Sequence, residues 1–245
     1  MTPQHIVQIS AYYPPNLGGQ ENAVYDLANQ LANANYQVDV LTSTQGGGFL
    51  GAINEGKVRV LRLPGLVFGH APIMPLFPFV LSRLVNRSSL VHLHIGQAFT
   101  PEMVYLMSKL RKFKYIAQLH IDFEPSGPAG IFLPLYKRLV LKRALLSASA
   151  VAVLNQKTYD IVRKIYGYTG PLYIVDNGID EALACRAEPP QALGRRRGRD
   201  HLHERQAPRL ERCGQRRTLL VGQIGHDEAA DADRGRARAQ GFVTE

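Results

Sequence analysis

The sequence predicts an α/β fold in which a doubly wound parallel sheet carries helices on both faces. Two observations predict it. Throughout residues 1–180, short apolar runs alternate with stretches in which apolar residues recur at helical spacing. Glycine, proline and asparagine also separate most of these segments, as is typical of strand–helix connections. The chain has 245 residues, of which 45% are hydrophobic, so it is long enough to bury a sizeable core.

The first strand, glycine turn and helix are the clearest elements. Residues 6–9 form a short apolar run, and Pro14 and Pro15 end it because proline has no N–H to give to a sheet. Gly18 and Gly19 then predict a tight turn. From Glu21 onward the apolar residues follow helical spacing, at Val24, Leu27, Ala28 and Leu31. The stretch therefore reads as strand, glycine loop, helix.

The following elements continue the alternation. Residues 64–78, rich in proline, glycine and apolar residues, are expected to form a mobile apolar loop rather than a regular helix. Asn155 is a good N-cap for the helix that follows it. The further strands are expected at 38–41, 57–63, 90–96, 112–119, 150–154 and 171–175, and the further helices at 79–84, 101–110, 133–146 and 158–166.

Several candidate binding residues lie at the ends of predicted strands. A glycine turn before a helix points free amide N–H groups and the positive end of the helix dipole at one place, where an anion such as a phosphate could bind. A plain tight turn is the alternative, because the sequence has neither the dinucleotide fingerprint nor a P-loop. His94 and His120 also follow apolar runs. Ligands of parallel sheets bind at the carboxyl ends of strands, so these residues are site candidates.

Composition excludes several classes of protein. The two cysteines, Cys185 and Cys213, have no metal-ligand spacing, and disulfide stapling is not expected, which fits a reducing cytoplasm. The sequence shows no signal-peptide pattern and no apolar run of the roughly 20 residues that a membrane span needs. The formal net charge of +9 is compatible with nucleic acid, an anionic membrane or an anionic ligand.

Several motifs then resemble one enzyme family. The start of the chain, Tyr-Tyr-Pro-Pro followed by Gly-Gly-x-Glu and a helix, is similar to the N-terminus of the family 4 glycosyltransferases of GT-B fold. Val-His-Leu-His at 91–94, Leu-His-Ile-Asp at 119–122 and Val-Asp-Asn-Gly-Ile-Asp at 175–180 resemble further motifs of these enzymes. Three positions depart from the usual pattern: Ser149 replaces an aspartate, Asn155 a serine and Asp176 a proline. The resemblance covers about residues 4–180 and implies a Rossmann-like fold, the N-terminal half of a GT-B enzyme.

The resemblance also implies roles for individual residues. Gly18 and Gly19 would line the cleft beside the donor phosphates and sugar, and Glu21 would cap or orient their loop. His120 would point into the cleft near the transferred sugar as the catalytic candidate, although a satisfied edge histidine is the alternative. Asp122 would contact the acceptor.

His94 is a further candidate for contact with donor or acceptor. It shares a strand face with His92, because residues at i and i+2 point to the same side. Two histidines on one strand are more often packing or hydrogen-bonding residues than ligands. A metal is conceivable there, but no carboxylate is near in sequence, and the family needs neither metal nor cofactor.

The reaction that the resemblance implies is transfer of a hexose, with retention, from a nucleotide-sugar donor to a saccharide or lipid-linked acceptor. In the family, an arginine, a lysine and two glutamates separated by seven residues bind the donor from the second domain. Residues after 180 contain no such constellation. The basic amphipathic segment 133–146 suits a surface helix packed on the sheet, with peripheral contact to the inner face of a membrane as a second use.

The tail differs sharply from residues 1–180, which we take as the first, acceptor-side domain. Residues 181–245 contain 13 arginines, no lysine and one aromatic residue, a composition that predicts disorder. Residues 218–225 resemble the first strand of the second GT-B domain. Three interpretations stay open: an out-of-frame or degenerate translation, which we favour, a natural linker, or an arginine-rich arm that binds nucleic acid. Mixed acidic residues and absent stacking aromatics argue against the last.

Two functions therefore compete on sequence grounds. The first is a glycosyltransferase whose chain is incomplete, and weakly active or inactive alone. The alternative is a non-catalytic module, derived from such an enzyme, that binds an acceptor or a partner.

Overall fold

The computed structural model describes residues 4–45, 47–68, 71–86, 88–120, 131 and 133–175. Their main feature is a sheet of eight strands in the order β10-β9-β8-β7-β1-β2-β4-β3, in which all neighbours are parallel except β3 and β4. The predicted α/β class is confirmed, with one antiparallel strand added at an edge. The strands are β1 (His5–Ile9), β2 (Gln37–Ser43), β3 (Gly51–Glu55), β4 (Val58–Leu63), β7 (Ser89–Ile95), β8 (Tyr115–Leu119), β9 (Ala150–Val153) and β10 (Leu172–Ile174).

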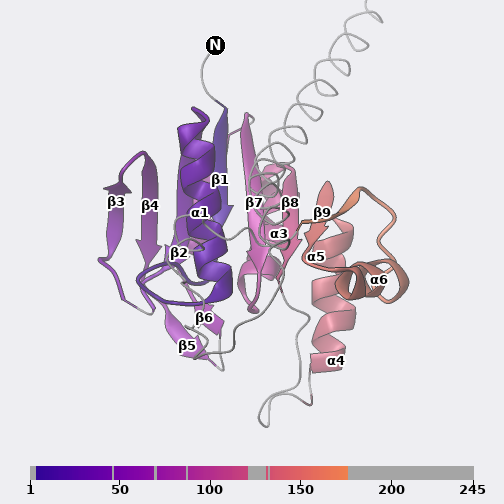
Figure 1. Ribbon diagram of the computed structural model, residues 1–245. Coiled ribbons are helices and arrows are strands. Elements are labelled where there is room, and N and C mark those ends of the chain that lie inside the picture. Colours follow the sequence, from indigo (N-terminus) through magenta and orange to yellow (C-terminus); the bar gives the residue numbers. More distant parts are fainter. Residues whose placement is uncertain are drawn as a thin grey trace, which may run out of the picture. The chain divides into compact units, whose positions relative to one another are not determined.

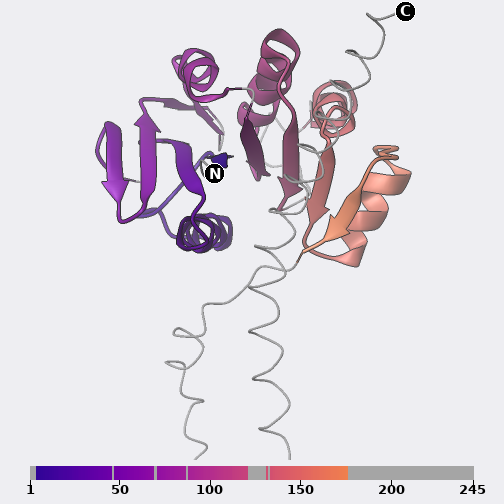
Figure 2. The same ribbon diagram turned by 90° about the horizontal axis from the view of Figure 1, so that it is seen from above.

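Helices cover both faces of this sheet (Figures 1 and 2). The helix α1 lies on one face, whereas α2, α3 and the helix that runs from α4 to α5 lie on the other (Figure 2). This division follows from right-handed crossovers, because the chain leaves β1 in one direction along the sheet and later returns to build the other half. The helices are α1 (Gly19–Asn33), α2 (Phe77–Leu84), α3 (Thr100–Arg111), α4 (Leu133–Tyr136), a π-helical segment (Lys137–Leu141), α5 (Lys142–Leu146) and α6 (Gln156–Lys164).

The strand β1 lies at the centre of the sheet. It pairs in parallel with β2 through His5 and Gln37, and with β7 through His5 and Ser89. The residues of β1 after His5 are buried, as expected for a strand with sheet on both sides and helices above and below. Val7 and Ile9 face the larger apolar core, on the side of α2 and α3, and Gln8 points to the other face.

Two local predictions about helices are confirmed. The helical spacing after the glycine turn forms α1, whose Val24, Leu27 and Leu31 are buried. The Asn155 side chain accepts a hydrogen bond from the Thr158 N–H at 2.9 Å and so caps α6. A cap of this kind satisfies one of the N–H groups that the first turn of a helix leaves without an internal partner.

The predicted loop over residues 64–78 is wrong. Residues Leu66–Phe68 (β5) and Ala71–Ile73 (β6) form an antiparallel hairpin, and α2 already begins at Phe77. The prolines are compatible with this arrangement, since Pro72 lies in a two-stranded ribbon and Pro78 in the first turn of a helix, where no N–H is needed. The edge strand β3 (Gly51–Glu55) was missed, because its residues are largely exposed and carry no alternating pattern.

A chain of polar side chains joins four strands at the amino edge of the sheet. The buried Asp39 carboxylate on β2 accepts hydrogen bonds from His5 Nε2 on β1 (2.9 Å) and from Arg59 Nε on β4 (2.7 Å). His5 Nδ1 lies 2.8 Å from Ser89 Oγ on β7. Burial alone would raise the pKa of Asp39, but the hydrogen bonds and positive charge of His5 and Arg59 outweigh it, so the pKa is lowered.

We expect Asp39→Asn to lower the free energy of unfolding by about 2–3 kcal/mol, because it removes the anion that His5 and Arg59 surround. The folded-state pKa of Asp39 lies below its unfolded value. The native protein should therefore lose this contribution as the pH falls from about 5 through the folded pKa, whereas the variant should lack this part of the acid dependence.

Denaturant unfolding at a series of pH values measures both effects. Asp160→Asn is the matched control, since Asp160 forms an exposed i,i+4 pair with Lys164 and its loss should cost less than about 0.5 kcal/mol. Equal losses for the two variants would contradict a special role of Asp39.

Candidate functional site

The glycine turn precedes α1 at the carboxyl edge of the sheet. A Cβ atom at Gly18 would lie 2.1 Å from Glu21 Oε2, so the Glu21 side chain folds back over the glycine. The buried Glu21 carboxylate also accepts a hydrogen bond from Asn16 Nδ2 at 3.3 Å. Glu21 therefore contacts the loop at Asn16 and Gly18, and its carboxylate takes the space that a side chain at position 18 would occupy.

The first turn of α1 offers backbone donors. Its N-cap is Gly18, and no side chain among the described residues caps it. The amide N–H groups of the first turn and the positive end of the helix dipole thus meet at this edge. Gly19 begins the helix, and a Cβ atom there would meet nothing within 4 Å. The two glycines are therefore not equivalent: a side chain at position 18 would displace the Glu21 carboxylate, whereas one at position 19 would meet open space.

Three histidines form the second part of the site. His94 on β7 and His120 directly after β8 are both buried, and His94 Nδ1 lies 3.0 Å from His120 Nε2. Since two neutral imidazoles can share only one proton in such a bond, one ring donates and the other accepts, and each fixes the tautomer of the other. His92 packs beside His94, with ring centroids 4.2 Å apart. His94 thus supports His120 from the neighbouring strand.

The side chain of Gln20 links the glycine turn to the histidine strand. Gln20 Nε2 donates to Ser10 Oγ, after β1, at 3.2 Å. A Cβ atom at Gly96, which follows β7, would lie 1.8 Å from Gln20 Oε1. The exits of β1 and β7 are therefore joined through the first turn of α1.

This place is the point at which the strand order reverses. The chain moves from β1 outward to β2 and β4, then returns to β7 and moves outward in the other direction. Loops that leave adjacent strands toward opposite faces leave a crevice between them, and ligands of open α/β sheets bind there. The turn with Gly18, the strand end with His94 and the exit of β8 with His120 flank this point.

Arg62 is a residue that sequence reasoning missed. It lies on β4 with a nearly buried side chain, and its Nη2 atom donates to Pro14 O (2.7 Å) and Glu55 Oε1 (2.8 Å). Its guanidinium also lies 5.4 Å from the centre of the Tyr13 ring. Arg62 thus holds the loop between β1 and α1. The available signal was its position: Arg62 falls on the same strand face as the buried Val58 and Val60, whereas Arg59 lies on the other face.

Tyrosines in the same loop stay neutral phenols. Burial raises the pKa of Tyr12, and the charge of Glu21 raises it further. Burial also raises the pKa of Tyr13. The loop therefore brings one carboxylate, Glu21, and neutral hydrogen-bonding groups to this edge.

One predicted site residue and two predicted segments fall outside the part of the chain that the structure describes. Asp122 lies outside the described residues, as do the motif at 176–180 and the tail 181–245. Within the described part of the chain, no group of three or more histidine, cysteine, aspartate or glutamate side chains could hold a metal ion. His92, His94 and His120 form a cluster with one hydrogen bond and tilted ring contacts.

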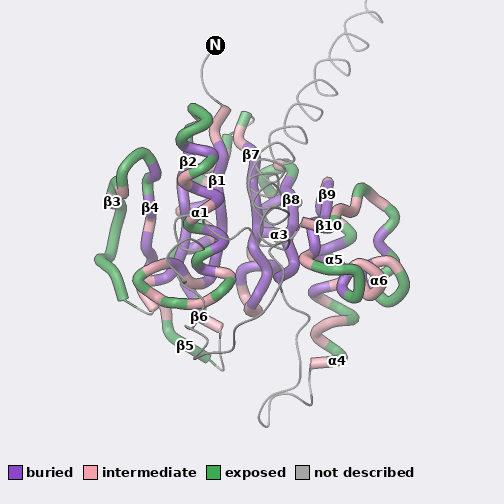
Figure 3. Tube along the Cα trace, viewed as in Figure 1, coloured by how far each residue is buried: buried purple, intermediate pink, exposed green. Residues whose placement is uncertain are grey.

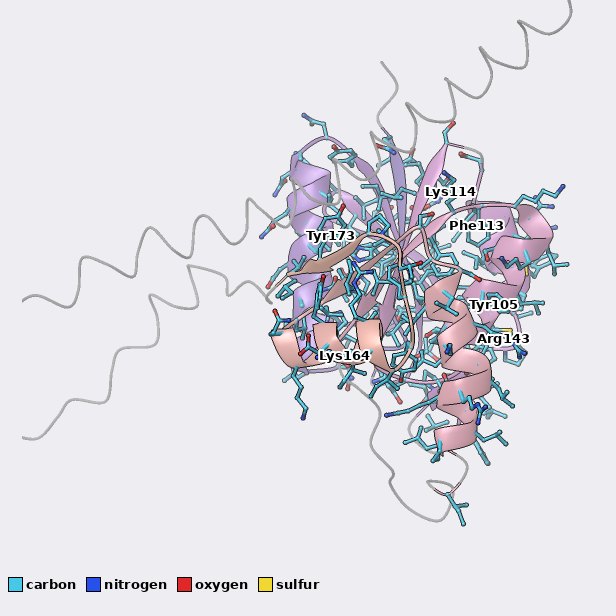
Figure 4. All side chains as sticks on the ribbon, turned by 90° about the vertical axis from the view of Figure 1, so that its right-hand side faces the viewer. Tyr105, Phe113, Lys114, Arg143, Lys164 and Tyr173 are labelled. Carbon is cyan, nitrogen blue, oxygen red and sulfur yellow. The ribbon has the colours of Figure 1, made fainter. Side chains whose placement is uncertain are left out.

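A surface pocket lies away from the candidate site, at the opposite edge of the sheet. It has a volume of about 310 Å³ and is placed where α2 and α3 end, at the amino edge of the sheet. Its lining residues are Val85, Asn86, Leu110, Arg111, Lys112 and Phe113. Phe113 and Lys114 lie on the side shown in Figure 4. The pocket is thus separate from the carboxyl edge where the candidates gather.

Taken together, these features define a Rossmann-like α/β domain with a candidate site at the switch point of its sheet. Residues 17–183 match the family model described as Glycosyltransferase Family 4. This match covers more than half of the chain and includes the glycine turn and both site histidines. The chain belongs to glycosyltransferase family 4.

Three solved structures with a similar backbone trace are a sucrose-phosphate synthase, an alpha-glucosyltransferase and a plant protein, UGT89C1. A sucrose-phosphate synthase from Thermosynechococcus elongatus has 18% sequence identity and a TM-score of 0.48, and the match covers 74% of this chain and 94% of that one. An alpha-glucosyltransferase in complex with UDP and DNA has 12% identity and a TM-score of 0.48, with 75% and 44% covered. Arabidopsis thaliana UGT89C1 complexed with UDP has 15% identity and a TM-score of 0.44, with 71% and 48% covered.

The chain thus spans about half the length of the last two proteins. A comparison with curated protein sequences gave no match. The family assignment rests on the match to the family model.

We expect Gly18→Ala and Gly19→Ala to differ. The new methyl group at 18 displaces the Glu21 carboxylate and breaks its bond from Asn16, which should lower the free energy of unfolding by about 1 kcal/mol. At 19 the methyl group meets open space in a helix, so the effect should be neutral or stabilising by a few tenths of a kcal/mol, about 0.5 at most. Denaturant unfolding compares the pair, and an equal loss at both positions would refute the packing of Glu21 on Gly18.

Proposed function

We propose that residues 1–180 are the acceptor-side domain of a GT-B glycosyltransferase that transfers a hexose from a nucleotide-sugar to a saccharide or lipid-linked acceptor with retention. The observation that carries the proposal is the family match over residues 17–183, which spans the glycine turn and the histidine pair. The switch-point position of these residues supports it, because it provides backbone donors and imidazoles at one edge.

The glycine turn is assigned to the donor. Gly19 leaves open space at the start of α1, so a phosphate or sugar can approach the first amides of the helix closely, whereas the Glu21 side chain covers Gly18. Glu21 holds the turn through Asn16 and Gly18 and is a positioning residue in this scheme. A negative diphosphate that leaves the sugar is stabilised by such fixed donors during bond cleavage.

His120 is assigned to the transferred sugar. Its ring is buried and held by His94 at 3.0 Å, so it can present a hydrogen bond to a sugar hydroxyl without reorientation. In this scheme His94 acts through His120 rather than on the ligand. Asp122 is assigned to the acceptor from its motif alone.

A peripheral membrane contact would suit a lipid-linked acceptor. Leu135 and Leu139 are exposed on the helix formed by residues 133–146, and Arg143 lies on the exposed side of α5 (Figure 4). Such a mixture of apolar and basic side chains fits an interfacial helix. No helix among the described residues is long and apolar enough to cross a membrane.

A second candidate is a binding module without catalysis. It is favoured by one sequence observation: residues 181–245 do not show the combination of an arginine, a lysine and two glutamates seven residues apart by which the family binds the donor. In that case the chain holds an acceptor or partner, and its turnover alone is weak or absent.

Titration of the full chain with nucleoside diphosphates, followed by a transfer assay with the corresponding nucleotide-sugars, separates the candidates. A donor-competent protein binds one of the diphosphates. In that protein His120→Asn should lower kcat/KM by about 100-fold, because it removes a positioned ring from the reacting sugar, while diphosphate affinity changes less.

Lys164→Ala is the control, since Lys164 is exposed on α6, which packs on β9 and β10 at the edge of the sheet and not on β1 or β7. Full activity of His120→Asn would reject the role of His120. Absence of both diphosphate binding and transfer would leave the binding module as the function.

A further inference from the structure

The hairpin of β5 and β6 exposes an apolar face. Its register pairs Leu66 with Ile73 and Phe68 with Ala71, so these four side chains lie on one side of the ribbon. Leu66 is 79% exposed and Phe68 is 73% exposed. Side chains of this size are rarely left in water as a contiguous group unless the surface binds something.

The helix after the hairpin extends this apolar surface. Leu76, next to the start of α2, and Phe79, one turn further on, are 51% and 54% exposed. The Arg83 guanidinium lies 3.7 Å from the centre of the Phe79 ring. We call Leu66, Val67, Phe68, Ile73, Leu76 and Phe79 the apolar tip; all six are exposed.

The apolar tip lies at the same end of the domain as the candidate site. The hairpin lies beyond the carboxyl edge of the sheet, the edge that carries the site, and α4 also extends past this edge (Figure 1). Figure 3 shows exposed segments on β5 and at the α4 end of the domain. The tip is therefore at the functional end of the domain rather than on a side wall.

The segments that form the tip and the helix from α4 to α5 contain basic but no acidic residues. The sequence has no acidic residue between Glu55 and Glu102, and none between Glu124 and Asp160. The helix from α4 to α5 carries four basic residues, Lys137, Arg138, Lys142 and Arg143. An apolar tip and a basic helix that extend past the same edge of the sheet are complementary to a surface with an anionic outer layer and an apolar interior. A second copy of this chain would instead place like charges against each other.

We propose that the apolar tip inserts into the headgroup and acyl boundary of an anionic membrane, with the basic helix 133–146 against the lipid phosphates. The carboxyl edge of the sheet then faces the lipid surface. This inference rests on exposure and charge and not on sugar transfer; only its use for a lipid-linked acceptor rests on the proposed function.

The chain contains no tryptophan, which allows a direct test. Phe68→Trp places a single tryptophan on the tip of the full chain. With vesicles of phosphatidylcholine and phosphatidylglycerol, its fluorescence emission should shift to the blue and be quenched by spin labels attached near the lipid headgroup. Leu110→Trp is the matched control: Leu110 is 65% exposed but lies near the end of α3, at the amino edge, so its emission should not change.

A second pair of variants measures the contribution of the tip to binding. Leu66→Ser combined with Phe68→Ser should lower the vesicle partition coefficient about tenfold or more, because each buried apolar side chain adds strongly to membrane affinity. Leu110→Ser should leave it unchanged. The arginine-rich residues 181–245 are common to all variants, so their attraction to anionic lipid cancels in the comparison.

Three outcomes would overturn the proposal. The wild-type chain fails to bind the vesicles; it binds them while the tryptophan at 68 keeps its water-exposed emission; or that emission shifts with protein concentration in the absence of lipid, which would indicate self-association. None of these outcomes depends on nucleotide binding or transfer, so failure here is distinct from failure of the proposed function. Circular dichroism confirms that each variant is folded.

Discussion

The parallel pairing of β1 with β2 on one side and β7 on the other is the constraint on which the rest of the structure depends. Because right-handed crossovers place their helices according to the direction of travel along the sheet, this central strand puts α1 on one face and α2 and α3 on the other (Figure 2). The loops that leave β1 and β7 consequently diverge. The topology therefore places the glycine turn and the histidine pair at the switch point of the sheet, where ligands of open α/β sheets bind.

The two edges of the sheet have different roles. At the amino edge, buried Asp39 is surrounded by His5 and Arg59, so that polar groups from neighbouring strands satisfy one another and stabilise the sheet. At the carboxyl edge, the first amides of α1 lie near the imidazoles of His94 and His120. No metal-binding group of side chains is found among the described residues. The stabilising polar network and the candidate site thus lie at opposite ends of the same strands, which allows the loops of one end to vary without loss of the fold.

The hairpin of β5 and β6 adds a third feature at the carboxyl edge. It interrupts the regular alternation between β4 and β7 and carries apolar side chains outward, where they are exposed. In the proposed arrangement, a membrane-facing tip and a sugar-transfer site share one end of the domain. A lipid-linked acceptor could then be reached without leaving the bilayer surface.

The sequence by itself determined the α/β class, most of the strand and helix positions, and the Asn155 cap, because these follow from side-chain periodicity and from hydrogen bonds within a few residues. Local patterns failed for residues 64–78 and for β3, whose strands form only when a partner supplies the hydrogen bonds. Only the tertiary structure decided that His94 bonds to His120, 26 residues away, and that Arg62 holds the loop at Pro14. Those contacts depend on which strands become neighbours, and strand order is a property of the whole chain.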